Sequence, residues 1–200
     1  MEIVLATTNQ HKVEEIRAIL ADMPVEITSL RDYPEIPEIE EIGSTFAENA
    51  SIKARTVSDA TGKVALADDS GLEVDALGGL PGVLSNRYAG PGATDEQKYM
   101  LVVSRVRDLA QEQRTARFRC AVAIAVPEGD IFVVEGAVEG VITLEPRGDH
   151  GFGYDPIFYV PSLEHTMAEL PPETKNEISH RGKALQAAKK VLAELVALSG

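Results

Sequence analysis

An acidic pair directly after a short apolar run is the feature that most constrains this chain. Residues 64–67 are apolar, and Asp68, Asp69, Ser70 and Gly71 follow them. A run of this length predicts a buried strand, and carboxylates followed by small turn residues predict that the strand ends there. Paired carboxylates at such a position offer oxygen ligands to a divalent metal. The alternative is a pair of solvated turn acids in an acidic protein, so other motifs have to decide between the two.

A second acidic pair, Glu40 and Glu41, lies in a segment rich in proline and glutamate, residues 31–43, which we expect to form a loop. Pro34 and Pro37 interrupt any regular element there. If this loop approaches the first acidic pair, the two pairs together make an oxygen-rich site.

Charge and composition exclude several classes of protein. The formal net charge of −13 over 200 residues argues against a protein that wraps DNA or RNA, because phosphate contacts need a basic face. A small phosphorylated ligand stays compatible, since it needs only a few cations and a metal. No apolar run approaches the roughly 20 residues of a membrane span, and the N-terminus reads as a strand rather than a signal segment. The single cysteine, Cys120, excludes an internal disulfide and is expected in the core, which makes a cytoplasmic location the default.

Short apolar runs alternate with helical spacings along the chain. Residues 3–6 predict a first strand, and residues 72–76 predict a short strand separate from the one before the acidic pair. Two longer strands are expected over residues 118–126 and 131–142, joined by a Pro-Glu-Gly-Asp turn into an antiparallel hairpin. This order predicts an α/β fold, a mixed sheet flanked by helices, with the hairpin extending the sheet into a second lobe.

The segment from Thr7 to Lys12 joins the first strand to a helix with apolar residues at Val13 and Ile16. Asn9 is a suitable N-cap, so the N–H groups that follow it point out of a helix N-terminus, where anions bind. Lys12 in the first turn opposes the helix dipole, and its position is costly unless an anion binds nearby. The glycine and lysine spacing of a P-loop is absent.

A capping box opens a second helix that carries a polar pair. Thr45 and Glu48 are three residues apart, as the box requires. Asn49 and Lys53 are four apart on the same helix and therefore share one face. They form either an ordinary polar face or part of a binding site.

A third cationic segment lies near the C-terminus. Lys175 precedes Ser179, which is expected to cap a last helix with His180 and Arg181 in its first turn. Cations at helix ends together with a carboxylate cluster for Mg²⁺ are the parts that a triphosphate-hydrolysing site requires. Their joint presence favours a nucleotide enzyme.

Five motifs occur in order along almost the whole chain: LATTNQHK, TFAENASIKA, ADDSGLEVDALGGLPG, GFGYDPIF and KNEISHRGKAL. In these motifs the sequence resembles the HAM1-like family of inosine triphosphate pyrophosphatases, also called dITP/XTP pyrophosphatases. Thr8 stands where many relatives carry glycine.

The resemblance implies hydrolysis of noncanonical purine nucleoside triphosphates (dITP, ITP and XTP) to the monophosphate and pyrophosphate. It implies an elongated mixed sheet flanked by helices, here one domain over residues 1–200 with two lobes and the nucleotide cleft between them. It also implies a Mg²⁺ cofactor and a homodimer, with no nucleic acid polymer and no membrane as partner.

The resemblance also assigns roles to residues. Asp69 would be the general base and a metal ligand, Glu40 a further metal ligand, and Glu41 the alternative to Glu40. Held near Mg²⁺, Asp69 is expected to keep a low pKa. The substrate-binding residues would be Thr7, Thr8, Asn9, Gln10, His11, Lys12, Lys53, Ser70, Phe152, Gly153, Tyr154, Asp155, Lys175, His180 and Arg181.

Base recognition would combine stacking with hydrogen bonds to the purine edge. Phe152 would stack on the purine without distinguishing one purine from another. Arginine offers only donors, so Arg181 directed at position 6 would bond the keto oxygen of hypoxanthine or xanthine and meet the adenine amino group with a like donor.

Two alternatives come from other groups of proteins. The first is a Maf-like pyrophosphatase that acts on modified pyrimidine nucleotides. The second is a nucleotide-binding sensor that does not cleave its ligand, which would have no use for an acidic pair beside the phosphates.

Overall fold

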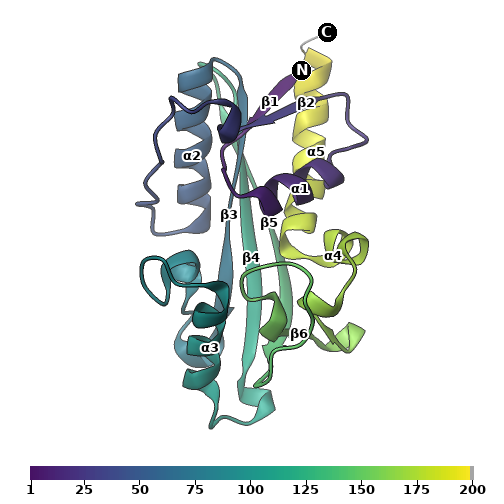
Figure 1. The fold of residues 1–200 in the computed structure, drawn as a ribbon. Coiled ribbons are helices and arrows are strands. Elements are labelled where there is room, and N and C mark those ends of the chain that lie inside the picture. The colour runs from purple at the N-terminus through teal and green to yellow at the C-terminus, as the bar shows by residue number, and fades with distance from the viewer. Residues whose placement is uncertain (199–200) are drawn as a thin grey trace. The chain divides into compact units, whose positions relative to one another are not determined.

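The computed structural model describes residues 1–198 and contains a mixed β-sheet with helices packed along it (Figure 1). Within these residues the sheet has seven strands in the order β2-β1-β3-β4-β5-β6-β7. β1 pairs in parallel with β2 and β3, whereas β6 pairs antiparallel with β5 and β7. The expected α/β fold with a mixed sheet is confirmed. The strands are β1 (Glu2–Leu5), β2 (Glu26–Ser29), β3 (Val64–Val74), β4 (Thr115–Ala125), β5 (Ile131–Ile142), β6 (Phe158–Val160) and β7 (His165–Thr166).

Two of the helices begin at capping residues that the sequence predicts, Asn9 and Thr45. Asn9 Oδ1 accepts hydrogen bonds from the backbone N–H groups of His11 and Lys12 at 3.0 and 3.4 Å, and Thr45 Oγ1 accepts one from Glu48 N at 3.1 Å. None of the helices in residues 1–198 is both long and apolar enough to cross a membrane. The α-helices are α1 (Gln10–Ile19), α2 (Phe46–Thr61), α3 (Asp95–Val106), α4 (Pro172–Ile178) and α5 (His180–Leu198).

The chain divides into two compact units. Unit 1 comprises residues 1–69, 120–136 and the chain from Arg181 onward, and unit 2 comprises residues 70–119 and 137–180. Because the divisions fall inside β3, β4 and β5, each of these strands contributes residues to both units.

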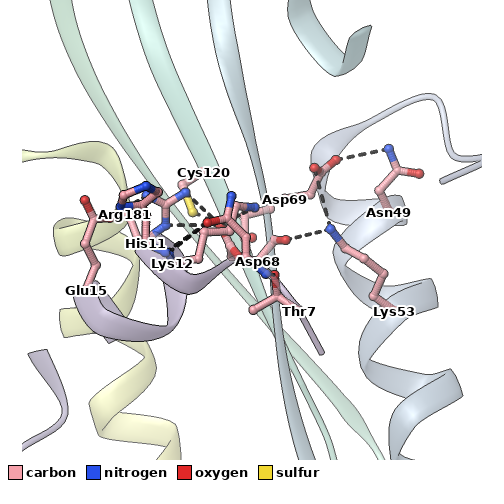
Figure 2. A network of polar contacts seen from close by, with 12 residues as sticks. Thr7, His11, Lys12, Glu15, Asn49, Lys53, Asp68, Asp69, Cys120 and Arg181 are labelled. Carbon is pink, nitrogen blue, oxygen red and sulfur yellow. Dashed lines mark hydrogen bonds and ion pairs between the residues drawn. The ribbon is translucent and has the colours of Figure 1, made fainter. Parts of the chain in front are cut away.

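Each unit has its own hydrophobic core. In unit 1, β1 and β3 lie between α2 on one side and α1 with α5 on the other (Figures 1 and 2). The side chains of Leu5, Leu66, Ile16 and Leu185 belong to one buried cluster of this unit. The core of unit 2 gathers apolar side chains of β3, α3, β4 and β6, among them Leu72, Val102, Phe118 and Phe158. Burial of this apolar surface is the main stabilising contribution in both units.

The expectation that the strand ends at the acidic pair is wrong. β3 runs without a break from Val64 to Val74, so Asp68 and Asp69 lie in its middle and residues 72–76 begin as its continuation rather than as a separate strand. Consecutive residues of a strand point to opposite faces of the sheet, so the two carboxylates point in opposite directions. Each meets cationic or donor side chains on its own face, which is why a strand can carry both acids in its interior.

Candidate active site

Asp68 is directed toward α1 and α5, where two cations hold it (Figure 2). Its Oδ2 accepts hydrogen bonds from Arg181 Nε and Nη2 at 3.1 and 3.0 Å and lies 3.0 Å from Lys12 Nζ. The side chain of Asp68 is fully buried, and its Oδ1 has no hydrogen-bond partner within residues 1–198. Arg181 also donates from Nη1 to Glu15 Oε2 at 2.6 Å. Two acids and two cations therefore form one group beside α1, in which Asp68 and Arg181 are buried and Lys12 and Glu15 are partly exposed.

Asp69 is directed toward α2 and meets the polar pair predicted to share a face (Figure 2). Asn49 Nδ2 donates to Asp69 Oδ2 at 3.0 Å, and Lys53 Nζ lies 3.7 Å from Asp69 Oδ1. Lys53 also donates to the backbone carbonyl of Asp68 and to Glu41 Oε1, both at 2.7 Å. Asn49 and Lys53 thus belong to the acidic site rather than to an ordinary solvated face.

The two neighbouring acids have pKa values shifted in opposite directions. Burial alone would raise the pKa of Asp68, but the charges of Lys12, Arg181 and Lys53 outweigh it and lower that pKa. Burial raises the pKa of Asp69, and Glu41 adds to this rise, while Lys53 and Lys12 oppose it. The low pKa expected for Asp69 beside a metal stays a prediction. Opposed environments of two adjacent acids are typical of catalytic sites.

The turn before α1 is organised by its own polar side chains. Thr7 Oγ1 accepts from Asn9 N at 3.1 Å, and Asn9 in turn caps the helix. Within residues 1–198, positive φ angles outside glycine occur only at Glu128 and Glu164, so Thr8 fits the turn without a left-handed backbone. The remaining predicted members of this turn, Gln10 and His11, are exposed on the first turn of α1.

A second cluster of predicted site residues lies in unit 2. Lys175 Nζ and Asp155 Oδ2 form a buried ion pair at 2.6 Å, and the same carboxylate oxygen accepts from Phe152 N at 3.0 Å. The ammonium of Lys175 lies 4.9 Å from the centre of the Phe152 ring, within the range of a cation–π interaction. One carboxylate therefore orders both the lysine and the backbone that carries the aromatic ring.

Four other residues of unit 2 were predicted to bind the substrate, and the structure places each of them. The Tyr154 hydroxyl donates to the carbonyl of Ser85 at 2.7 Å, and its ring is part of the core. His180 stacks on Phe118 with ring centres 4.6 Å apart. Gly153 N donates to Asp95 Oδ2 at 2.7 Å, and Ser70 is half-buried.

Comparison with known sequences decides the family. The pattern that defines the Ham1 family matches residues 3–191. The chain belongs to the Ham1 family.

Relatives within the Ham1 family are similar over nearly their whole length. The dITP/XTP pyrophosphatase of Desulforamulus reducens is 50% identical over 195 residues, which cover 98% of this chain and 97% of the relative. The dITP/XTP pyrophosphatase of Bacillus subtilis is 49% identical over 191 residues, covering 96% of each. Among solved structures, a HAM1 protein from Coxiella burnetii superposes with a TM-score of 0.89 at 47% identity, covering 97% of this chain and 99% of that one. The resemblance noted in the sequence is confirmed.

The contacts of Arg181 in this Ham1 chain differ from the role in base recognition predicted for it. Its three guanidinium nitrogens all bond the carboxylates of Asp68 and Glu15, and the residue is only 2% exposed. The guanidinium would have to leave these carboxylates to reach a purine, so reading of position 6 by Arg181 stays a prediction.

Sequence reasoning missed Glu15, treated Asp68 only as part of the acidic pair, and left Asn49 open between a polar face and a binding site. Glu15 lies three residues after Lys12 on α1, so the helical spacing placed it on the right face, but nothing indicated Arg181 as its partner. For Asn49 the signal was present in the shared face with Lys53.

Gly151 offers a test of the Asp155–Lys175 pair. A Cβ added at Gly151 would overlap Asp155 Oδ2 and lie 3.0 Å from Lys175 Nζ, whereas one at Gly153 would meet nothing within 4 Å. Both glycines have positive φ, 77° and 64°, so alanine at either costs about 1–2 kcal/mol in backbone strain. Gly151→Ala should cost about 3 kcal/mol more than Gly153→Ala in urea unfolding, because it also breaks a buried ion pair. Equal losses in the two variants would show that the pair does not depend on the space at Gly151.

Proposed function

We propose that this chain is a dITP/XTP pyrophosphatase, which hydrolyses noncanonical purine nucleoside triphosphates (dITP, ITP and XTP) to the monophosphate and pyrophosphate and so removes them from the nucleotide pool. Two lines of support are its membership of the Ham1 family and the name of its relatives. The observation that carries the proposal is the placement of Asp69, a buried carboxylate with a raised pKa beside Lys53, on the same strand as an acid that holds Lys12.

Asp69 is proposed as the general base. Water adds to the α-phosphorus, its proton passes to a carboxylate oxygen of Asp69, and the bond from the α-phosphorus to the bridging oxygen breaks to release pyrophosphate. The contacts with Asn49 and Lys53 hold this carboxylate in place on β3, as a general base requires. Asn49 bonds Oδ2 of this carboxylate at 3.0 Å, and Oδ1, which lies 3.7 Å from Lys53 Nζ, is the proposed proton acceptor.

The cations and the helix end are proposed to hold the phosphates. The turn from Thr7 to Lys12 leads into the N-terminus of α1, where backbone N–H groups favour an anion. Lys12 and Lys53 carry the positive charge that would oppose the charge developing on the leaving pyrophosphate. Both ammonium groups pair with carboxylates, which hold them near the proposed phosphate site.

The donors around Asp69 suit a Mg²⁺ ion. In the described part of the chain no group of three or more His, Cys, Asp and Glu side chains gathers as a metal site. Mg²⁺ commonly takes only one or two carboxylates and completes its shell with substrate phosphates and water, so two acids suffice. Lys53 Nζ lies 2.7 Å from Glu41 Oε1 and 3.7 Å from Asp69 Oδ1, so a positive charge is already accommodated between these two acids.

The assignment of the second metal ligand changes with these contacts. We propose Asp69 and Glu41 as the acids that would hold Mg²⁺, with Glu40, which is exposed, as the weaker choice. The ion would supply charge neutralisation on the phosphates and activation of the attacking water.

Unit 2 is proposed to supply the contacts to the base and sugar. Phe152 offers a ring for stacking, and the ammonium of Lys175 close to that ring orders it. Asp155, Tyr154, Gly153 and His180 are carried over from the family resemblance as neighbours of the nucleoside. The homodimer, the two-lobed domain and the cytoplasmic location remain predictions.

A substrate panel tests the proposal. Purified protein with Mg²⁺ should release pyrophosphate from ITP, dITP and XTP, with kcat/KM at least about 10²-fold above that for ATP, because a site that bonds a substrate keto group rejects its amino analogue. Products should be identified by ³¹P NMR, and modified UTP should be included to test a Maf-like specificity. Release of orthophosphate alone, or a preference for modified UTP, would refute the proposal.

A further inference from the structure

The side-chain amide of Asn49 donates one hydrogen bond and accepts another. The residue lies on α2 and is 1% exposed. Its Nδ2 donates to Asp69 Oδ2 at 3.0 Å, and its Oδ1 accepts from Gly43 N at 2.7 Å. We infer that Asn49 is a positioning residue, which fixes the orientation of the Asp69 carboxylate and ties the acidic loop, residues 38–43, to it. This inference rests on the proposed function, in which Asp69 is the general base.

The chemistry of these partners dictates an amide at this position. An ionised carboxylate only accepts hydrogen bonds and a backbone N–H only donates, so the side chain between them has to do both. This also fixes which way round the amide lies, with nitrogen toward Asp69 and oxygen toward Gly43. Aspartate has the same shape as asparagine but lacks the donor, and it would place a second carboxylate against Asp69.

Gly43 leaves the space that the second bond needs. A Cβ at this position would lie 2.7 Å from Asn49 Oδ1 and 2.7 Å from Glu48 Cβ. Gly43 is not among the glycines with positive φ, so the close approach of Asn49, rather than the backbone conformation, excludes a side chain here.

The same loop is attached to α2 at a second point. Glu41 Oε1 bonds Lys53 Nζ at 2.7 Å, and Lys53 also lies 3.7 Å from Asp69 Oδ1. Asn49 contacts Asp69 Oδ2 and Lys53 lies close to Asp69 Oδ1 (Figure 2). Their other bonds, to Gly43 N and Glu41 Oε1, connect these two contacts to the acidic loop. Loss of the Asn49 side chain would remove the hydrogen bond that orients Oδ2 of the carboxylate and would release the loop at Gly43.

Three variants separate the two bonds of Asn49. Asn49→Leu removes both, Asn49→Asp keeps an acceptor for Gly43 N but removes the donor to Asp69, and Gly43→Ala displaces the amide from the loop side. Because a catalytic group misplaced by about 1 Å can cost 10²-fold in rate, we expect kcat for ITP to fall about 10- to 100-fold in each, with KM changed less than about threefold. Gly129→Ala is the matched control for the glycine substitution, since its Cβ would meet Val126 at an ordinary 3.4 Å.

A readout that does not depend on turnover accompanies the kinetics. Hydrogen exchange of the Gly43 amide, followed by NMR, should be slow in the wild type and in Asn49→Asp but fast in Asn49→Leu. The double variant Gly43→Ala/Asn49→Leu should be no slower in turnover than the slower single variant, because both changes act through one bond. Thermal unfolding identifies any variant that fails to fold, in which case Asn49→Asp and Gly43→Ala carry the test.

The outcomes distinguish this inference from the proposed function. If the wild type cleaves ITP and the folded Asn49 and Gly43 variants keep wild-type kcat, the inference is wrong while the proposed function stands. Equal Gly43 exchange in the wild type and in Asn49→Leu would also overturn it. If the wild type itself does not release pyrophosphate from ITP, the proposed function fails and the inference fails with it.

Discussion

Asp69→Asn should lower kcat for ITP hydrolysis by about 10³-fold, within the range that a general base contributes. Asparagine keeps the size of the side chain and an acceptor for Asn49 Nδ2, which now donates to Asp69 Oδ2 at 3.0 Å. What it loses is the ability to take a proton from water at neutral pH. The loss should therefore appear in kcat, with the fold intact.

The same substitution should leave the protein as stable as the wild type or more stable. Burial raises the pKa of Asp69, and Glu41 adds to the rise. For a carboxyl whose pKa is higher in the folded than in the unfolded state, stability falls as pH rises above the unfolded value, here near 3.8. At pH 7 the ionised Asp69 is thus a destabilising group, and asparagine removes that charge.

Two measurements are made on each protein. Turnover is assayed with Mg²⁺, and thermal unfolding is followed in EDTA at pH 7. Asp22→Asn serves as the control, because Asp22 pairs with Lys189 on the surface, away from Asp69. Turnover near the wild-type value in Asp69→Asn would remove Asp69 from the mechanism. A large drop in Tm would instead show that its charge stabilises the fold.

Local signals in the sequence predicted most of the elements. The caps at Asn9 and Thr45 and the apolar spacing of α5 are decided within a few residues of the chain, and each element forms where expected. Leu185, Ala188 and Leu192 recur at helical spacing in the sequence, and all three are fully buried. Such signals depend on backbone hydrogen bonding and amphipathic periodicity, which the sequence displays directly.

The features that the sequence did not predict depend on contacts between residues that are far apart along the chain. β3 continues through Asp68 and Asp69 because cations and an amide from α1, α2 and α5 satisfy the two acids, and Arg181 reaches Asp68 across 113 positions. No local pattern indicates such a partner. The choice between Glu40 and Glu41 was open for a related reason, since a loop without periodicity does not show which side chain turns toward Lys53.

Because of its partners, Asp68 should contribute more to the stability of the fold than Asp69 does. Asp68→Asn should lower the free energy of unfolding at pH 7 by about 3–5 kcal/mol, the usual cost of removing one member of a buried ion pair. Its Oδ2 now bonds Arg181 at two nitrogens and lies 3.0 Å from Lys12 Nζ. The variant would leave Arg181 buried with Glu15 as its remaining carboxylate partner among the contacts described here.

The pH dependence of this loss has a definite sign. The charges of Lys12, Arg181 and Lys53 outweigh burial and lower the pKa of Asp68 below its ordinary value of 3.8. A carboxyl with a lowered pKa in the folded state contributes stability that is complete above the unfolded pKa and is lost as pH falls toward the folded pKa. The difference in stability between wild type and Asp68→Asn should therefore be largest near neutral pH and should shrink steadily below about pH 4.

Urea unfolding of both proteins at several pH values between 3 and 7 measures this difference, with Asp22→Asn as the surface control. A Tm drop of about 6–20 °C at pH 7 is the corresponding thermal result for a chain of this size. A stability difference that does not change with pH would mean that Asp68 stabilises the fold through packing rather than through its charge. The opposite expectations for Asp68→Asn and Asp69→Asn then separate the two neighbouring acids of β3, since the first pairs with Arg181 and Lys12 and the second is the proposed general base.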